Sequence, residues 1–225
     1  MKVIGITGLI GSGKGTVSDF LIEDGFVKIA FADALKDAVA KIFGWPRELL
    51  EGDTEESRTW REQPDNWWAE RLQRPYFSPR VALQLMGTEA SRNVFHADIW
   101  VSVLERKISN LQADGAVRGV VVPDVRFVNE IECIKRLGGT LVRVQRGPLP
   151  DHWEETSRYN KILNLLETGS EDDSEFAVRH RAWLDDNIHM SEWAWIGMDN
   201  PDFVIFNNFD LATLQKCAKQ LAAED

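Results

Sequence analysis

The sequence predicts an α/β fold in which a parallel sheet of about five strands is flanked by helices and carries helical or lid-like insertions. Short apolar runs alternate with helical patterns along the chain, which is typical of βαβ units. The run Val120–Val122 is apolar without alternation, as expected for a strand buried on both faces. A glycine-rich stretch, Gly8–Thr16, separates the first apolar run from the first helical pattern. This strand–loop–helix order fits the same fold class.

The individual elements follow from the apolar runs and from the signals at helix ends. The predicted strands are Val3–Ile6, Val27–Phe31, Gly119–Val122, Thr140–Val144 and Phe203–Phe206. The predicted helices are Gly13–Asp24, Ala34–Phe43, one that begins at Ser78-Pro79, Ala97–Ala113, Phe127–Leu137 and Leu211–Ala222. Ser78-Pro79 is a good pair for a cap and a first turn, and glycines close the second and fifth helices.

We expect one domain over residues 1–225, because this length suits a single domain with insertions. Two segments break the alternation of strands and helices. Residues 45–77 are charged and rich in Trp and Arg, and we expect them on the substrate side. Residues 149–195 are acidic in their middle and are expected to be lid-like. The tryptophans of both segments either build a substrate pocket or simply pack the insertions, and for any single Trp the second reading is favoured.

Composition excludes several classes of protein. The net charge of −10 disfavours binding to a nucleic-acid backbone. No stretch is long and apolar enough to span a bilayer, so we expect a soluble, cytoplasmic protein without a membrane partner. Cys133 and Cys217 both fall in helical patterns and are expected to be reduced, buried thiols. No Cys/His cluster has zinc spacing, and no protein metal site is predicted.

The stretch Gly8–Thr16 carries the strongest chemical signal. Its spacing Gly8-x4-Gly13-Lys14 matches the phosphate-binding loop, or P-loop. The glycines allow backbone N–H groups to approach phosphate oxygens, and the following helix N-terminus favours an anion. Lys14 would supply a point charge for β- and γ-phosphates. The common loop has Ser or Thr directly after the lysine, whereas here Gly15 follows Lys14 and Thr16 comes next. This form is similar to nucleoside monophosphate kinases, and magnesium would then be held partly through waters and phosphates.

A second constellation follows the third predicted strand. Asp124 stands at the carboxyl end of that strand, at the sheet edge where such folds bind ligands. It could orient Arg126 or hold magnesium through water. Glu130 lies in the first turns of the next helix, and we expect it to face the same crevice. With a P-loop at the same edge, a functional role for this group is favoured over a structural one.

Other candidates have two readings each. Gly87 interrupts a helical pattern at a cost of about 1 kcal/mol, which indicates either a close approach to its backbone or a helix end at Met86. Lys36 either contacts a phosphate or is simply solvated. One of Arg58 and Arg61 could reach across a transferring phosphate, although surface arginines are common. The segment His189–Glu192 is either a helix cap or a phosphate contact.

Taken in order, these motifs resemble the phage-type deoxynucleoside monophosphate kinases. The matching pieces cover most of the chain and include the specific combination of Gly-Thr-Glu, Asp-Val-Arg-Phe-x-Asn-Glu and His-x-Ser-Glu. They are Gly8–Thr16, Phe31–Asp37, Arg80 with Leu85–Glu89 and Trp100, Pro123–Glu130 with Leu137–Arg146, and His189–Glu192 with Asn207-Asn208. The insertions match least.

The resemblance implies a P-loop kinase fold and phosphoryl transfer from ATP, with Mg²⁺, to a deoxynucleoside monophosphate. It implies ATP binding by Gly11, Gly13, Lys14, Gly15 and Thr16. We expect catalytic roles for Lys14 and for one or more of Arg61, Arg80 and Arg126 around the transferring group. The acceptor would be bound by Lys36, Arg80, Gly87, Thr88, Trp100, Asp124, Arg126 and Glu130. If phage-encoded, the protein would act in the host cytoplasm. The Trp-rich surfaces would allow a homodimer, which the resemblance also favours.

Two other functions stay open on the sequence. One is a different small-molecule P-loop kinase, similar to dephospho-coenzyme A kinase or adenylate kinase. The other is a nucleotide-binding switch that hydrolyses ATP slowly and yields no phosphorylated small molecule. For the deoxynucleoside monophosphate kinase, the acceptor phosphate is already anionic near neutral pH, so we expect no general base and a mechanism of positioning and charge neutralisation.

Overall fold

The computed structural model describes residues 1–115, 117–165 and 171–223. Within them the chain forms two compact units, the first made of Met1–Ile29 and Leu111–Asp225, and the second of Ala30–Asn110. The expected single domain with insertions at 45–77 and 149–195 stays a prediction. Residues 166–170 of the second insertion lie outside the described residues.

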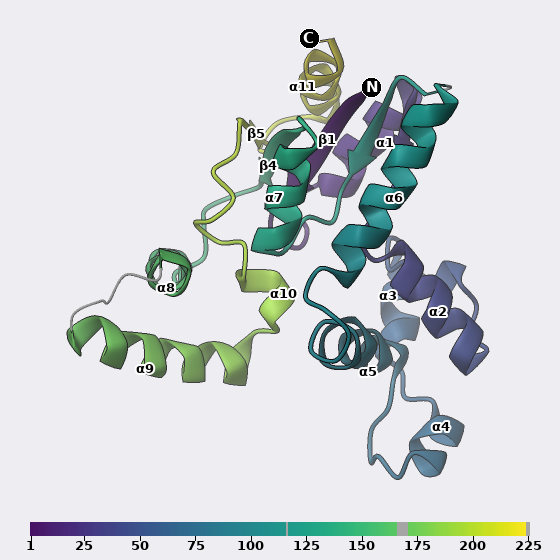
Figure 1. Cartoon of the computed structure of the whole chain (residues 1–225), viewed down its shortest axis with the longest axis vertical. Coiled ribbons are helices and arrows are strands. Elements are labelled where there is room, and N and C mark those ends of the chain that lie inside the picture. The colour runs from purple at the N-terminus through teal and green to yellow at the C-terminus, as the bar shows by residue number, and fades with distance from the viewer. Residues whose placement is uncertain (116, 166–170, 224–225) are drawn as a thin grey trace. The chain divides into compact units, whose positions relative to one another are not determined.

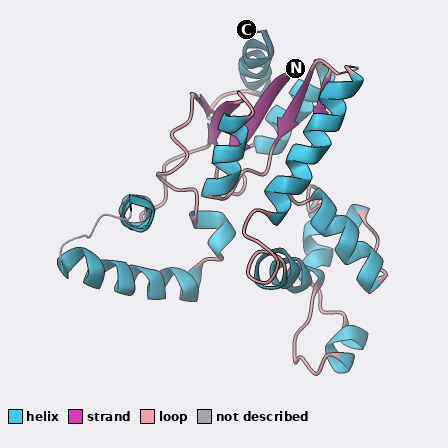
Figure 2. Ribbon diagram, in the orientation of Figure 1, coloured by secondary structure: helices cyan, strands magenta, loops and turns pink. Residues whose placement is uncertain are grey.

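The first unit is built on a parallel sheet (Figure 2). Its strands are β1 (Lys2–Thr7), β2 (Phe26–Lys28), β3 (Gly119–Val122), β4 (Thr140–Gln145) and β5 (Phe203–Phe206). They are ordered β2-β3-β1-β4-β5, and every neighbouring pair is parallel. This arrangement confirms the predicted fold class, with β1 at the centre.

Helices cover both faces of this sheet. Successive side chains of each strand point to opposite faces, so each face presents its own set of side chains to the helices. Ile4 and Ile6 of β1 belong to one buried cluster with side chains of α1 (Lys14–Glu23) and α11 (Leu211–Ala223). Helix α7 (Val128–Arg136) covers the other face (Figure 1). Gly5 lies against this helix, because a Cβ on Gly5 would be 2.7 Å from Ile134 Cγ1.

One predicted strand is shorter than expected. The apolar run Val27–Phe31 predicted a strand, whereas β2 ends at Lys28. The Ile29 N–H still donates to Val121 O at 3.0 Å, but the next N–H, that of Ala30, donates to Asp33 Oδ2 at 3.0 Å. This backbone group is therefore bonded to the first turn of the following helix instead of the sheet. Sequence hydrophobicity alone does not show that change of partner.

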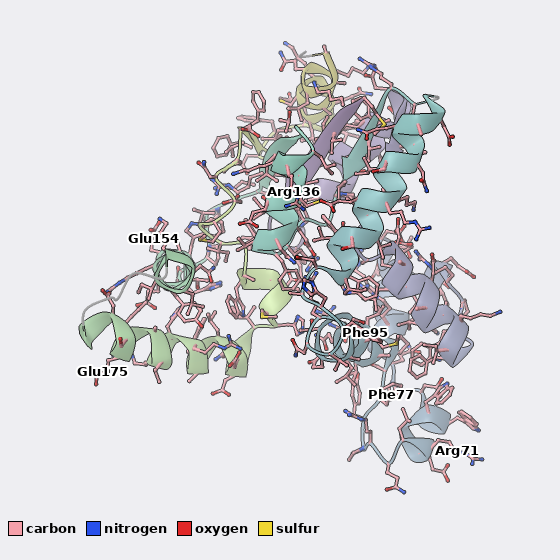
Figure 3. All side chains as sticks on the ribbon, viewed as in Figure 1. Arg71, Phe77, Phe95, Arg136, Glu154 and Glu175 are labelled. Carbon is pink, nitrogen blue, oxygen red and sulfur yellow. The ribbon has the colours of Figure 1, made fainter. Side chains whose placement is uncertain are left out.

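The second unit is helical. It contains α2 (Asp33–Phe43), a 3₁₀ turn η1 (Glu48–Leu50), α3 (Glu55–Glu62), α4 (Asn66–Arg71), α5 (Pro79–Gln84), a π-helical turn η2 (Leu85–Ala90) and most of α6 (Ile99–Asp114). Its core includes Trp45 and Phe77, the latter labelled in Figure 3. Phe43 stacks on Trp45 with ring centroids 4.6 Å apart, and Trp60 and Trp68 pack against the same core. These tryptophans therefore pack the insertion, the reading that is favoured for a single Trp.

The segment between β4 and β5 forms α8 (Trp153–Leu165), α9 (Glu171–Asn187) and the short α10 (Met190–Trp193). Helices α8 and α9 are joined by a hydrogen bond between Thr156 Oγ1 and His180 Nε2 at 3.0 Å and by an ion pair between Arg158 and Asp173 at 2.6 Å. Across residues 1–115, 117–165 and 171–223, no helix combines the length and the apolarity that a membrane crossing needs.

Candidate functional site

The P-loop and the segment that follows β3 lie side by side at one edge of the sheet. The loop continues from β1, and Asp124 follows β3, the strand paired with β1. The pairing extends beyond the strands, because the Val125 N–H donates to Ile6 O at 3.3 Å. This edge holds the carboxyl ends of the strands, which is where open parallel sheets bind ligands.

The loop has the backbone shape that an anion site requires. Gly13 has a φ of +102°, a left-handed conformation that favours glycine, and it forms the N-cap of α1. A Cβ on Gly8 would lie 2.4 Å from Val144 O, so the start of the loop needs glycine to lie against β4. By contrast, a Cβ on Gly11 or Gly15 would meet no atom within 4 Å. Both positions border open space at the start of a helix, which suits bound phosphates.

Lys14 folds back over this loop. Its Nζ donates to Gly8 O at 2.7 Å and to Leu9 O at 2.8 Å. Burial, with a smaller contribution from the positive charge of Arg126, lowers the pKa of Lys14 to about 8, while the charges of Glu192 and Asp124 oppose this shift. The predicted Lys14, Asp124 and Arg126 therefore belong to one electrostatic site in the first unit, together with Glu192.

Arg126 is paired with a residue from the segment between β4 and β5. Its Nη1 forms an ion pair and hydrogen bond with Oε1 of Glu192 in α10. The ring of His189 caps α10 by accepting the Ser191 N–H at 3.3 Å, which confirms the helix-cap reading of that residue. The last helix of the predicted lid-like segment thus supplies a carboxylate to the P-loop site.

Glu130 performs a structural task beside its predicted role. Its buried carboxylate accepts the backbone N–H of Arg126 at 2.8 Å and that of Phe127 at 3.2 Å. These bonds shape the entry into α7 and fix the backbone that carries Arg126. A direct contact of Glu130 with substrate stays a prediction.

Glu130→Ala is expected to lower the free energy of unfolding by about 1–3 kcal/mol, because two backbone donors at the start of α7 lose a charged acceptor. Denaturant unfolding followed by circular dichroism measures this change. Glu132→Ala on the exposed face of the same helix is the control, with an expected change within about 0.5 kcal/mol. Equal losses in the two variants would contradict the capping role.

The remaining predicted residues lie in the second unit. Lys36 Nζ pairs with Glu51 Oε2 at 2.6 Å. Burial raises the pKa of Glu51, but the hydrogen bonds and charges of Lys36 and Arg47 outweigh it and lower the pKa overall. Arg61 lies over the same turn, where a Cβ on Gly52 would fall 1.9 Å from its Nη2. The second unit therefore brings Lys36 and Arg61 to one turn.

Arg80 has a different neighbour in that unit. It lies in the first turn of α5, and its Nε is 3.4 Å from Glu62 Oε1 on α3. Both side chains are at least one-third exposed, so the pair is screened by water and is weak. Arg80 can therefore exchange this partner for an anionic ligand at little cost.

Gly87, Thr88 and Trp100 gather around the π-helical turn η2. The helix does not end at Met86. Gly87 is buried, and a Cβ there would lie 2.9 Å from Leu35 Cδ2, so it is the Leu35 side chain that approaches the backbone closely. Trp100 Nε1 donates to Gly87 O at 2.9 Å. This carbonyl of the irregular helical turn therefore has a side-chain hydrogen-bond partner. Such π turns often occur at functional sites.

Sequence reasoning missed several residues around the P-loop. The sequence indicates Glu192 only as part of a cap or phosphate contact, and it does not predict the ion pair with Arg126. Buried Asp199 accepts from Thr7 Oγ1 at 3.2 Å and pairs with Arg143 at 3.3 Å, next to the start of the loop. Burial raises the pKa of Asp199, and Arg143 and Thr7 partly offset this. Asn207 bonds the loop itself.

Within the part of the chain that the structure describes, no three His, Cys, Asp or Glu side chains gather closely enough to hold a metal ion. The carboxylates of Asp124 and Glu192 near Lys14 are nevertheless oxygen ligands of the type that Mg²⁺ prefers. A magnesium ion at this site would therefore need waters or phosphate oxygens in addition to these side chains.

Comparison with known proteins gives matches to viral kinases, while no family model matches the chain. A protein of Acanthamoeba polyphaga mimivirus assigned as a deoxynucleotide monophosphate kinase is 34% identical over 154 residues, covering 65% of this chain and 75% of that protein. The deoxynucleoside-5′-monophosphate kinase of Escherichia phage T5 is 43% identical over 60 residues, covering 27% of this chain and 22% of that enzyme.

Two solved structures align with nearly the whole chain. TT1252 from Thermus thermophilus has 22% identity, a TM-score of 0.46 and coverage of 99% of this chain and 96% of that one. The dephospho-CoA kinase from Campylobacter jejuni has 16% identity, a TM-score of 0.40 and coverage of 98% and 95%. These weak similarities add nothing to the fold seen directly in the sheet. The sequence match over three quarters of the mimivirus protein is decisive, and the chain belongs to the deoxynucleoside monophosphate kinase family.

Proposed function

We propose that this protein transfers the γ-phosphoryl group of ATP to a deoxynucleoside 5′-monophosphate, giving ADP and the deoxynucleoside diphosphate. The observation that carries the proposal is the position of Lys14, held over the P-loop with Arg126, Asp124 and Glu192 around it. Family membership supports the same reaction.

The ATP phosphates would bind along the P-loop. The open positions at Gly11 and Gly15 leave room for phosphate oxygens, and the first turn of α1 brings Lys14 and Thr16 to the same place. Gly13 completes this set as the N-cap of that helix. Anions are stabilised there by unpaired N–H groups and by the helix dipole.

Asp124 and Glu192 are the residues that would approach Mg²⁺, Asp124 through a water molecule. Their carboxylate oxygens suit the ion, and their effect on the pKa of Lys14 supports a role beside the proposed phosphates. When bound, the ion supplies positive charge to phosphate oxygens.

The residues that we assign to binding of the acceptor nucleotide are Asp124, Arg126 and Glu130 of the first unit, and Lys36, Arg61, Arg80, Gly87, Thr88 and Trp100 of the second. Lys36 and Arg80 are each paired with a glutamate, so an incoming phosphate would compete with Glu51 and Glu62 for them. Trp100 offers a flat apolar ring, although its N–H is already bonded to Gly87 O.

The chemistry needs no general base. The attacking oxygen belongs to a phosphate that is already anionic near neutral pH, so the protein contributes positioning and neutralisation of charge. Lys14 and Arg126 would neutralise the oxygens around the transferring group, and Arg61 would act as a further cation. Glu130 holds the backbone of Arg126 in place while this occurs.

A coupled ADP-release assay tests the proposal. The acceptors are dAMP, dGMP, dCMP, dTMP, their ribose counterparts and dephospho-coenzyme A, each with ATP and Mg²⁺. We expect strong turnover with one or more deoxynucleotides and little with AMP or dephospho-coenzyme A. Turnover confined to dephospho-coenzyme A or AMP would replace this function with that of another small-molecule kinase. ATP binding without acceptor-dependent turnover would indicate a switch.

The pKa of Lys14 predicts a pH dependence of ATP binding. Because this pKa is lowered to about 8 in the free protein, the ammonium loses its proton above that pH, although phosphates require the charged form. ATP affinity should therefore fall by up to about tenfold per pH unit above about pH 8, with proton uptake on binding. Isothermal calorimetry in buffers of different ionisation enthalpy measures both effects. Lys14→Met should remove this slope, and an identical slope in the variant would contradict the assignment.

A further inference from the structure

We propose that Asn207 is a positioning residue that orients the Ser12–Gly13 peptide, so that the Gly13 N–H is presented to a phosphate of ATP. The inference rests on the proposed ATP site. The loop motif does not predict this role of Asn207, because Asn207 is 195 residues away from Ser12 in sequence.

Asn207 is fixed to the sheet before it reaches the loop. It directly follows β5, and its backbone N–H donates to Gln145 O at 2.8 Å, at the end of β4. The neighbouring Asn208 is bonded elsewhere, because its Oδ1 accepts the Gly147 N–H at 2.7 Å. The backbone of Asn207 is therefore anchored to the β4–β5 side of the sheet in the first unit.

The side chain of Asn207 lies directly on the loop. Its Nδ2 donates to Ser12 O at 2.9 Å. A Cβ on Gly13 would lie only 2.3 Å from the same Nδ2, so the amide occupies the space where a side chain would stand. Glycine at position 13 thus serves two needs, the positive φ of the loop and the close approach of Asn207.

This contact determines which way the peptide faces. In a trans peptide the C=O and the N–H point in opposite directions. With Ser12 O directed at Asn207, the Gly13 N–H must point away from it. The next carbonyl is fixed as well, because Gly13 O accepts the Val17 N–H at 3.1 Å in the first turn of α1. Both peptides beside Gly13 are therefore held, one by Asn207 and one by the helix.

Without the Asn207 amide, the Ser12–Gly13 peptide would be bounded by a glycine with wide conformational freedom. The peptide could then rotate, and binding of a phosphate would have to restore the orientation that it needs. The expected consequence is weaker ATP binding, with little change in affinity for the acceptor. This split separates a role at the loop from a general loss of stability.

The test compares Asn207→Ala and Asn207→Leu with Asn208→Leu. Alanine removes the donor and adds nothing near Gly13, whereas leucine keeps a similar size. Calorimetry with Mg·ATP gives the dissociation constant, and a thermal melt reports folding. We expect both Asn207 variants to bind ATP about 10- to 100-fold more weakly, the effect of losing the hydrogen bond from the Gly13 N–H to a charged phosphate. Asn208→Leu should bind as the wild type does.

Amide NMR spectra give a second readout. In the wild type, Mg·ATP should shift the Gly13 resonance strongly, and in Asn207→Ala this shift should be reduced. ATP binding by a folded Asn207→Ala within twofold of the wild type, or an unchanged Gly13 shift, would overturn the proposal. So would a wild type that binds no ATP. Neither readout uses an acceptor, so failure of the proposed kinase reaction can be told apart from failure of the Asn207 proposal. In the first case the wild type would bind ATP but transfer no phosphoryl group.

Discussion

Lys14→Met is expected to lower kcat for phosphoryl transfer by about 10³-fold or more, the largest effect of any substitution in the first turn of α1. The ammonium is the one side-chain charge of the loop, and two loop carbonyls hold it in place. Methionine has a similar length and shape but no charge. The loss would therefore fall on the neutralisation of phosphate oxygens and not on the packing of the loop.

Loss of the Lys14 charge should lower kcat but should not lower the stability of the fold. Burial lowers the pKa of Lys14 to about 8, which means that folding disfavours its charged form. The unfolded chain therefore binds more protons between that pKa and the ordinary one of 10.5, and the free energy of unfolding contributed by Lys14 rises with pH in this window. Near neutral pH, removal of the charge should leave the melting temperature unchanged or raise it.

Steady-state kinetics with a thermal melt of each variant measures both effects. Lys135→Met, at an exposed position in the last turn of α7, is the matched control and should keep the kcat of the wild type. Lys14→Arg tests geometry, because the planar guanidinium does not replace a compact ammonium. If Lys14→Met retained more than about a tenth of kcat, the role of Lys14 in the transition state would be wrong.

Arg126→Ala is expected to lower kcat by about 10³- to 10⁵-fold, as for an arginine that stabilises a transferring phosphoryl group. Arg126 is charged, it lies close enough to Lys14 to lower its pKa, and Glu130 holds its backbone. Its guanidinium is now bonded to Glu192, so an incoming anion would share or replace that carboxylate. Arg126→Lys should also lose most of kcat, because lysine lacks the planar fork.

Glu192→Gln tests the effect of the Glu192 charge, in the Arg126–Glu192 pair, on the pKa of Lys14. It removes the negative charge that opposes the lowering of the Lys14 pKa, so the pKa of Lys14 should fall further in this variant.

Arg136→Ala, at the exposed end of α7 and labelled in Figure 3, is the control for the Arg126→Ala variant. A kcat for Arg126→Ala within about tenfold of the wild type would exclude Arg126 from the transition state.

The parts of the site that sequence could predict are local. The loop Gly8–Thr16 and its strand and helix lie within one short stretch, where glycine spacing and apolar periodicity carry the information. The same holds for Asp124 and Arg126, since any residue at the carboxyl end of a parallel strand lies at the ligand edge. The parallel direction of the strands follows from the fold class, whereas the pairing of β1 with β3 comes from the structure.

The parts that sequence could not predict join distant segments. Arg126 and Glu192 are 66 residues apart, Thr7 and Asp199 are 192 apart, and Ser12 and Asn207 are 195 apart. Periodicity describes one element at a time, so it cannot pair side chains from different elements. Glu130 is a different case, because its position at the start of a helix is a local capping signal. The apolar Phe127 at the cap position obscures that signal.

The measurement that tests the central claim most directly follows the phosphoryl group itself. ATP radiolabelled in its γ-phosphoryl group is incubated with the wild type, Mg²⁺ and each deoxynucleoside monophosphate, and the products are separated by chromatography. We predict that label appears in the deoxynucleoside diphosphate, and that Lys14→Met and Arg126→Ala abolish this transfer. Label found only in inorganic phosphate, with every deoxynucleotide unchanged, would contradict the account.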